Sequence, residues 1–169
     1  MGMMGNLLRV TKAELDAYLE DSSLLEDKIY NDDVNEDEPE NEKFVDIDKT
    51  WDGIIFLLTG QSLDTAEHRF TRILFSGQLI DEDQDLGMGP AHYLTPDEVV
   101  ELNNEISIIT AADLKQKFNP EKMNELQIYP SIWDEGDDAF DYLIEGFLSV
   151  QYIFAEAAKN NEAIITYIN

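Results

Sequence analysis

The fold is decided near the end of the chain, where residues 137–168 read DDAFDYLIEGFLSVQYIFAEAAKNNEAIITYI. Apolar side chains recur every three or four positions over residues 137–159, which predicts one long helix with an apolar face. At 1.5 Å per residue this helix is about 33 Å long. The side chains expected to face the core are Phe140, Leu143, Ile144, Phe147, Val150, Phe154, Ala157 and Ala158. Residues 163–168 are almost continuously apolar, which predicts a β-strand at the centre of a sheet.

Short helices and a few strands are expected before this long helix. We predict that Asp48 caps a helix ending at Gly60, a residue suited to a left-handed C-terminal position. The capping signals at three other helix starts are Thr11 with Glu14, Thr95-Pro96 with Glu98, and Thr110 with Asp113. The remaining expected elements are strands at 2–10 and 91–94, helices at 11–20, 23–30, 65–76, 95–106 and 110–118, and a short helix from 119. The pattern predicts a single α+β domain over residues 1–169, rich in helix, with a small sheet that includes the C-terminal strand.

Residues 31–43 stand out by composition. They read NDDVNEDEPENEK, with seven acids, one base and almost no apolar side chains. Burial of apolar surface cannot offset the entropy of ordering such a segment, so we predict a mobile acidic loop on the surface. It is not expected to divide the chain into domains, because the preceding residues are too few to form a core.

Net charge narrows the possible functions. The 169 residues include 37 acids and 11 bases, for a formal net charge of −26, and 43% are hydrophobic. The apolar content supports a folded core, while the charge argues against direct binding to nucleic acid or to an anionic membrane. The chain has no cysteine, no run long enough for a membrane helix and no recognisable targeting segment. We therefore expect a cytoplasmic protein without disulfides.

One candidate ligand site lies at the glycine-rich turn before the strand at 91–94. Gly87 and Gly89 would let the backbone approach a ligand closely, with the side chains of His92 and Tyr93 beside it. The alternative is a plain turn leading into the strand. The spacing is too short for a dinucleotide-binding fingerprint, and no phosphate-binding loop motif is present.

No metal, cofactor or catalytic residue is predicted. Residues 81–85 place carboxylates at alternate positions like a calcium loop, but Leu86 and His92 stand where an EF-hand needs glycine and glutamate. The chain has two histidines, His68 and His92, and it lacks the Gly-x-Ser-x-Gly motif of serine hydrolases.

A candidate partner-binding site surrounds Trp133. We interpret this tryptophan as a partly exposed anchor rimmed by acids, because tryptophan is enriched at interface hot spots. The acids are Asp134, Glu135, Asp137 and Asp138. Together with the net charge, they favour a non-enzymatic binding protein that recognises a basic protein, either as a toxin-neutralising (immunity) protein or as a DNA mimic. The alternative is a small enzyme or ligand-binding domain with its pocket near residues 87–93.

Several short motifs, in order along the chain, resemble one family. They are Met1-Gly2-Met3, Asp48-Lys49-x-Trp51 with Phe56-Leu57-Leu58-Thr59-Gly60, residues 87–94 running into Thr95-Pro96, Tyr129-Pro130-x-x-Trp133, and the long helix before the last strand. In this the chain resembles the YfbM-like family of bacterial proteins, a domain of unknown function. The resemblance covers essentially the whole chain. It implies a compact α+β fold and no assigned activity.

Overall fold

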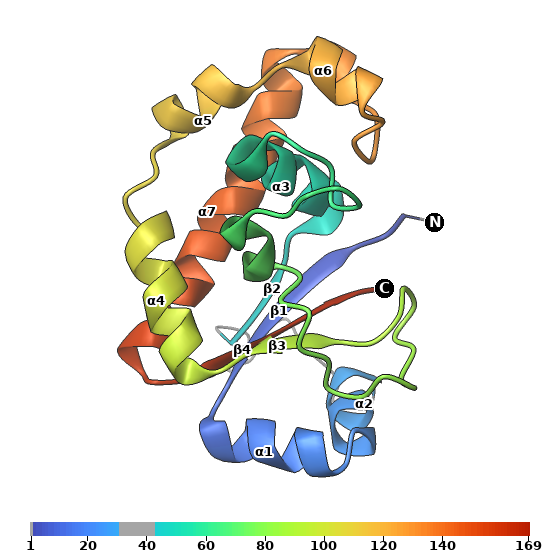
Figure 1. Cartoon of the computed structure of the whole chain (residues 1–169), viewed down its shortest axis with the longest axis vertical. Coiled ribbons are helices and arrows are strands. Elements are labelled where there is room, and N and C mark those ends of the chain that lie inside the picture. Colours follow the sequence, from blue (N-terminus) through green and yellow to red (C-terminus); the bar gives the residue numbers. More distant parts are fainter. Residues whose placement is uncertain (1, 31–42) are drawn as a thin grey trace.

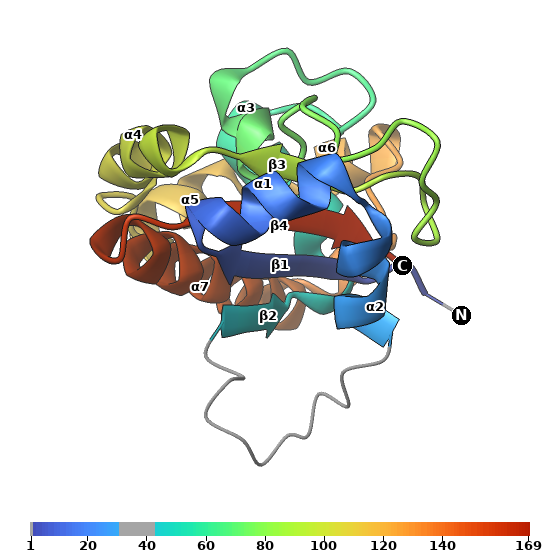
Figure 2. The ribbon, with the colours of Figure 1, turned by 90° about the horizontal axis from the view of Figure 1, so that it is seen from below.

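A four-stranded antiparallel sheet organises the residues described by the computed structural model, which are 2–30 and 43–169 (Figures 1 and 2). The strands are β1 (Gly5–Val10), β2 (Phe44–Asp46), β3 (His92–Leu94) and β4 (Ala163–Ile168). Their spatial order is β2-β1-β4-β3, so the apolar C-terminal strand is central, as predicted. The predicted mobile loop at 31–43 lies, except for its last residue, outside the described residues.

The two faces of the sheet contribute to two separate hydrophobic cores. Successive side chains of a strand point to opposite faces, and both central strands are apolar on both. Leu7 of β1 and Ile164 of β4 belong to the larger core, whereas Leu8 and Ile165 belong to the smaller one. This double burial explains why β4 lacks the alternation of polar and apolar residues typical of a solvent-exposed sheet.

Helices cover both faces of the sheet (Figure 1). The smaller core lies under α1 (Lys12–Glu20) and α2 (Ser23–Tyr30), which contribute Leu15 and Leu25. The helices that contribute to the larger core are α3 (Trp51–Thr59), α4 (Pro96–Ile106), α5 (Ala111–Lys117), α6 (Pro120–Glu125) and α7 (Asp137–Lys159). The described residues also include the short 3₁₀ helices η2 (Asp48–Thr50), η3 (Arg69–Ile73) and η4 (Trp133–Glu135).

The long helix α7 confirms the prediction at both ends. Of its predicted core residues, Ile144 and Ala158 are half-buried and the others are buried. Gly146 and Ile153 are buried as well, which the sequence prediction missed. A Cβ on Gly146 would overlap Thr50 Oγ1, so this glycine allows the segment before α3 to approach α7 closely.

Two predicted capping boxes form in full, at Thr11 and Thr110, and Gly60 ends α3 with the expected left-handed φ of 78°. At α4, Thr95 accepts a hydrogen bond from the Glu98 backbone N–H. The Glu98 carboxylate is turned away from the cap and accepts hydrogen bonds from Arg72 and Gln78. A tertiary contact therefore replaces the second half of this box.

Two local predictions are wrong. Asp48 does not cap α3, because it has a positive φ of 49° and begins the preceding 3₁₀ turn. Its carboxylate accepts a hydrogen bond of 2.6 Å from the Tyr142 hydroxyl of α7. The helix expected at 65–76 is only the 3₁₀ helix η3. Ion pairs to α4 at Arg69–Glu105 and Arg72–Glu98 hold this segment in place.

The buried ion pair between Arg9 of β1 and Glu162, just before β4, is expected to stabilise the fold, and a substitution can measure its contribution. Their side chains are 9% and 7% exposed, and their N and O atoms lie 2.5 Å apart. Because Glu162→Gln leaves the Arg9 charge buried without this carboxylate, we expect a loss of about 3 kcal/mol in the free energy of unfolding. Urea denaturation would measure it.

The matched control is Asp16→Asn, which breaks the exposed Lys12–Asp16 pair. That change should cost about 0.5 kcal/mol or less. Equal effects of the two substitutions would contradict a stabilising role for the buried pair.

Candidate functional site

The glycine turn before β3 is organised by Asp85. The Asp85 carboxylate accepts hydrogen bonds from the backbone N–H of Gly87 at 2.9 Å and of Gly89 at 3.1 Å. These bonds, the Gly87 one first, lower the pKa of Asp85 below its usual value. Both glycines have positive φ, 130° and 81°, which explains the need for glycine at each.

The close backbone approach predicted for Gly87 is made by the chain itself. A Cβ on Gly87 would lie 2.7 Å from the Cα of Asn169, just after β4. The next residue, Met88, donates its backbone N–H to the Ile168 carbonyl at 3.1 Å. The space that the sequence prediction assigned to a ligand at Gly87 is therefore occupied by the end of β4.

His92 and Tyr93 do not line one pocket, because neighbours in a strand face opposite sides of a sheet. His92 Nδ1 accepts a hydrogen bond of 3.1 Å from the Gly77 backbone N–H. Its ring meets the Phe75 ring edge-on at 5.6 Å, and burial lowers the pKa of His92. Tyr93 packs instead against the smaller core. The four predicted residues thus form a turn and a strand start without a shared cavity.

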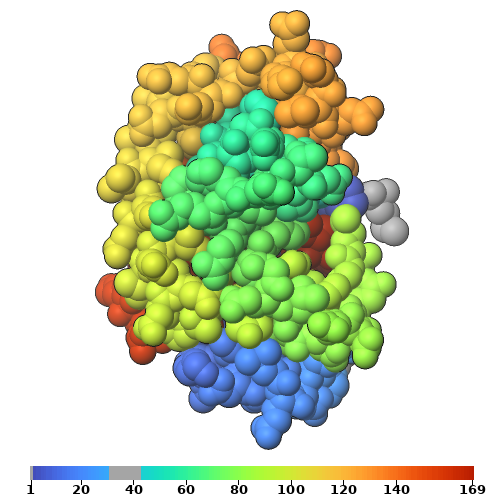
Figure 3. All heavy atoms as spheres, viewed as in Figure 1, coloured from blue at the N-terminus to red at the C-terminus, as the bar shows by residue number. Residues whose placement is uncertain are grey.

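A shallow apolar hollow lies nearby, and the sequence prediction did not find it. The hollow is small, about 10 Å³, which is room for roughly one water molecule. The ends of β1 and β4 line it, and the red C-terminal strand shows between the green segments in Figure 3. Trp51 and Phe75 form its walls, with ring centroids 6.0 Å apart, and Trp51 also stacks on Tyr129 at 5.2 Å. Residues from five separate segments meet here, so no local sequence pattern marks the hollow.

The polar groups around the hollow are engaged within the protein. Trp51 Nε1 donates to the Met3 carbonyl at 2.9 Å, and Thr166 Oγ1 donates to the Leu74 carbonyl at 2.5 Å. Asn6 Nδ2 donates to the Met4 carbonyl and to Asn169 Oδ1. These groups hold the sheet ends and the surrounding segments together, and the hollow has the character of packed structure rather than of a catalytic centre.

Trp133 corrects the second candidate site. Its side chain is fully buried, with 0% exposure, and its Nε1 donates a hydrogen bond of 2.8 Å to the Ile128 carbonyl. The 3₁₀ turn η4 directs the indole inward, and a Cβ on Gly53 of α3 would come within 2.9 Å of it. The predicted partial exposure is wrong, and Trp133 is a core residue that cannot anchor a partner in this structure.

The four acids near Trp133 are all exposed, as predicted. Asp134 accepts a hydrogen bond of 2.8 Å from Asn124, and Asp137 accepts one of 2.6 Å from Lys115. The hydrogen bond and the charge of Lys115 lower the pKa of Asp137. Glu135 and Asp138 stand beside them at the start of α7, where negative charge interacts favourably with the helix dipole.

Residues 2–30 and 43–169 contain no group of three or more histidine and acidic side chains arranged to hold a metal ion. Within the same residues, no helix has both the length and the apolar character needed to cross a membrane.

Comparison with known proteins identifies the family. The model of the family described as "Domain of unknown function (DUF1877)" matches residues 1–167. The chain belongs to this family. The DUF1877 chain is also similar to the crystal structure of YfbM from Escherichia coli, a protein of unknown function, with a TM-score of 0.76 and 17% identity over 98% of this chain and 99% of that one. No curated protein sequence matches it. The YfbM-like resemblance and the α+β fold are confirmed.

The environment of His92 predicts that its imidazole titrates at a lower pH than an ordinary histidine. Because burial lowers its pKa and Nδ1 accepts the Gly77 N–H, the neutral form is favoured in the folded state. We expect the ¹H NMR titration of His92 to have its midpoint below the ordinary histidine value of 6.5. As the pH falls, the unfolded chain binds a proton at His92 at a higher pH than the folded chain does. The contribution of neutral His92 to the free energy of unfolding is therefore fully present above pH 6.5 and is lost as the pH falls below 6.5 toward the lower pKa of the folded state. A His92→Gln spectrum assigns the resonance, and a midpoint at or above 6.5 would contradict the burial described here.

The burial of Trp133 predicts a stability defect. Trp133→Ala removes a fully buried indole and should lower the free energy of unfolding by about 3–5 kcal/mol, measured by urea denaturation. A truncated surface anchor would instead leave stability within about 0.5 kcal/mol of the wild type. Exposed Tyr152, at 46% exposure, offers the matched control through Tyr152→Ala.

Proposed function

We propose that the protein is a non-enzymatic, acidic binding protein that recognises a basic protein partner in the bacterial cytoplasm. The observation that carries this proposal is the charge balance: 37 acids stand against 11 bases. Many of the bases are already engaged by acids of the same chain. The ion pairs among the described residues include Arg9–Glu162, Lys12–Asp16, Arg69–Glu105, Arg72–Glu98, Lys115–Asp137 and Lys122–Glu125.

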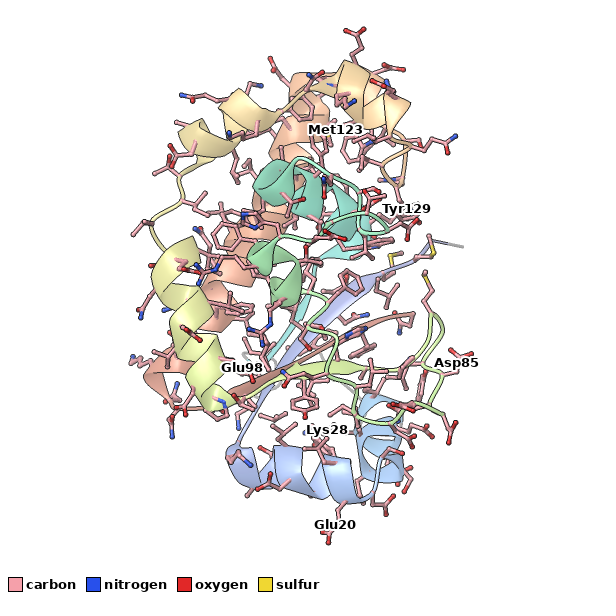
Figure 4. All side chains as sticks on the ribbon, in the orientation of Figure 1. Glu20, Lys28, Asp85, Glu98, Met123 and Tyr129 are labelled. Atoms are coloured by element: carbon pink, nitrogen blue, oxygen red, sulfur yellow. The ribbon has the colours of Figure 1, made fainter. Side chains whose placement is uncertain are left out.

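This pairing affects the field outside the molecule. An engaged base cancels one nearby acid, so the remaining carboxylates determine the potential that an approaching partner meets. Figure 4 shows Glu20 and Asp85 projecting from the surface, and both are exposed. A field of one sign attracts a partner of the opposite sign and raises the association rate, most strongly at low salt.

Two kinds of partner fit this chemistry. An immunity protein would cover the basic surface of a toxin, while a DNA mimic would occupy the basic surface with which a DNA-binding protein contacts phosphates. Both kinds need a carboxylate surface rather than a catalytic site, so the identity of the bound partner distinguishes them. The glycine turn favours neither an enzyme nor a ligand-binding domain, because His92 and Tyr93 face opposite sides of the sheet.

Affinity capture from the native host at low and high salt tests the proposal. We expect the tagged protein to retain a basic protein at a stoichiometric level, identified by mass spectrometry, and to release it as salt rises. The variant Asp134→Asn/Glu135→Gln/Asp138→Asn removes three exposed carboxylates and should weaken capture, because part of the attracting charge is lost.

His92→Ala is the matched control, because it alters the glycine-turn region without changing a carboxylate. It should leave capture unchanged. Retention of no basic protein at low salt would overturn the proposal, as would capture that is insensitive to salt.

A further inference from the structure

The outer face of α7 carries an ordered stripe of exposed side chains. Successive members are separated by alternating steps of three and four residues, which places them on one face of the helix. All seven are exposed, in contrast to the buried residues of the opposite face. The members of this outer stripe are Asp138, Asp141, Glu145, Leu148, Tyr152, Ala155 and Lys159.

The outer stripe has two chemically distinct halves. Its first three members are acids, whereas the next three are apolar. Leu148 is 54% exposed and Tyr152 is 46% exposed, although the larger core lies on the other side of the same helix. Neither side chain therefore serves the packing of the sheet. Leu148 and Tyr152 are four residues apart, so their exposed side chains are neighbours on the helix surface and present one apolar strip to a partner.

A neighbouring segment broadens the apolar half. Gln151 Nε2 donates to the carbonyls of Ile106 and Ile109 at 2.8 and 2.9 Å, which ties the end of α4 to α7 at this level. Ile108, within the tied segment, is 76% exposed. The segment that carries this exposed isoleucine is therefore bonded to α7 at the level of the apolar half.

The helix that carries the outer stripe is held firmly in place. The Tyr142 hydroxyl donates to Asp48 at 2.6 Å and accepts from the Lys49 backbone N–H at 3.0 Å. Gly146 is in close contact with Thr50 on the buried side. A rigid platform loses little conformational freedom when a partner binds, which favours affinity.

We propose that the outer stripe is the docking surface for an amphipathic α-helix of the basic partner. The inference rests on the proposed function and locates its interface. A facing helix with apolar residues at heptad spacing would pack on Leu148, Tyr152 and Ala155. Its other half would carry lysine or arginine opposite Asp138, Asp141 and Glu145.

Charge argues against a second copy of this chain as the occupant. Parallel pairing of two outer stripes would place the three acids of each opposite the acids of the other, which is repulsive. Antiparallel pairing would place the acids of each copy over the apolar half of its neighbour, where Lys159 is the single base of the stripe. The outer stripe is thus complementary to a basic amphipathic helix and not to itself.

A defined peptide tests the docking surface with the full-length protein. The probe is a fluorescein-labelled peptide of about 20 residues, long enough to match the stripe. It has leucine at heptad positions in one half and lysine in the other, and a shuffled peptide of identical composition controls for charge. Fluorescence anisotropy should show that the ordered peptide binds at least about tenfold more tightly than the shuffled one.

Variants locate the binding. Leu148→Ser/Tyr152→Ser should weaken binding of the ordered peptide by about tenfold, and Asp141→Asn/Glu145→Gln should reduce its salt dependence. Leu19→Ser/Leu24→Ser is the matched control, because these residues on α1 and α2 are 40% and 45% exposed but lie away from the stripe. That control should bind like the wild type, and circular dichroism would verify that each variant is folded.

Other outcomes overturn the inference and separate it from the proposed function. Equal, salt-sensitive binding of both peptides, unchanged by the stripe variants, would reject the docking surface and leave an acidic binding protein. Self-association that is lost in Leu148→Ser/Tyr152→Ser would assign the stripe to a second copy. Binding of neither peptide, with no basic protein captured from the host, would reject both proposals.

Discussion

The pairing of β1 with β4 is the constraint on which the rest of the structure depends. These two strands come from opposite ends of the domain and pair over their full lengths, from Gly5 with Ile168 to Val10 with Ala163. Because both are apolar on both faces, one ladder of hydrogen bonds provides the base of both cores. The edge strands β2 and β3 are short and pair with this central ladder. α1 and α2 therefore depend on the same strands as the much larger helical layer on the other face.

The basic and acidic side chains have different places in the structure. The Arg9–Glu162 pair is buried, and the pairs of Arg69 and Arg72 connect η3 to α4. These bases hold elements of the fold together, while acids predominate on the exposed residues. A partner that carried acids would meet repulsion over much of this surface. The charge that would attract the proposed basic partner therefore also disfavours acidic ones.

The sequence predicted the structure best where interactions between residues close in sequence determine it. The bounds of α7 and β4, the capping boxes at Thr11 and Thr110 and the left-handed Gly60 follow from periodicity and from the hydrogen bonds of helix ends. The errors arose where distant segments meet. Asp48 is recruited by Tyr142, and ion pairs to α4 constrain the segment expected to be a helix at 65–76.

The candidate sites show the same division. The exposure of the acids beside α7 could be predicted because charged side chains are rarely buried without partners. The burial of Trp133 could not, because it depends on Gly53 leaving room in another helix. Likewise, Gly87 signalled a close approach, but only the fold reveals that Asn169 makes it. A glycine pattern reports that something lies near the backbone without identifying it.

The antiparallel register of β1 and β4 also determines how the sheet responds to force. Gly5 and Ile168 are paired, and beyond them Met4 and Asn169 exchange backbone hydrogen bonds, so β1 begins and β4 ends at the same end of the ladder. Ladder bonds in an antiparallel pair run perpendicular to the strands. Tension applied across these two adjacent points would therefore load the bonds one after another, as in a zipper, rather than all together in shear. In solution the β1–β4 ladder is stabilised by a hydrophobic core on each face. Under tension it is mechanically weakest when Met4 and Asn169 are pulled apart.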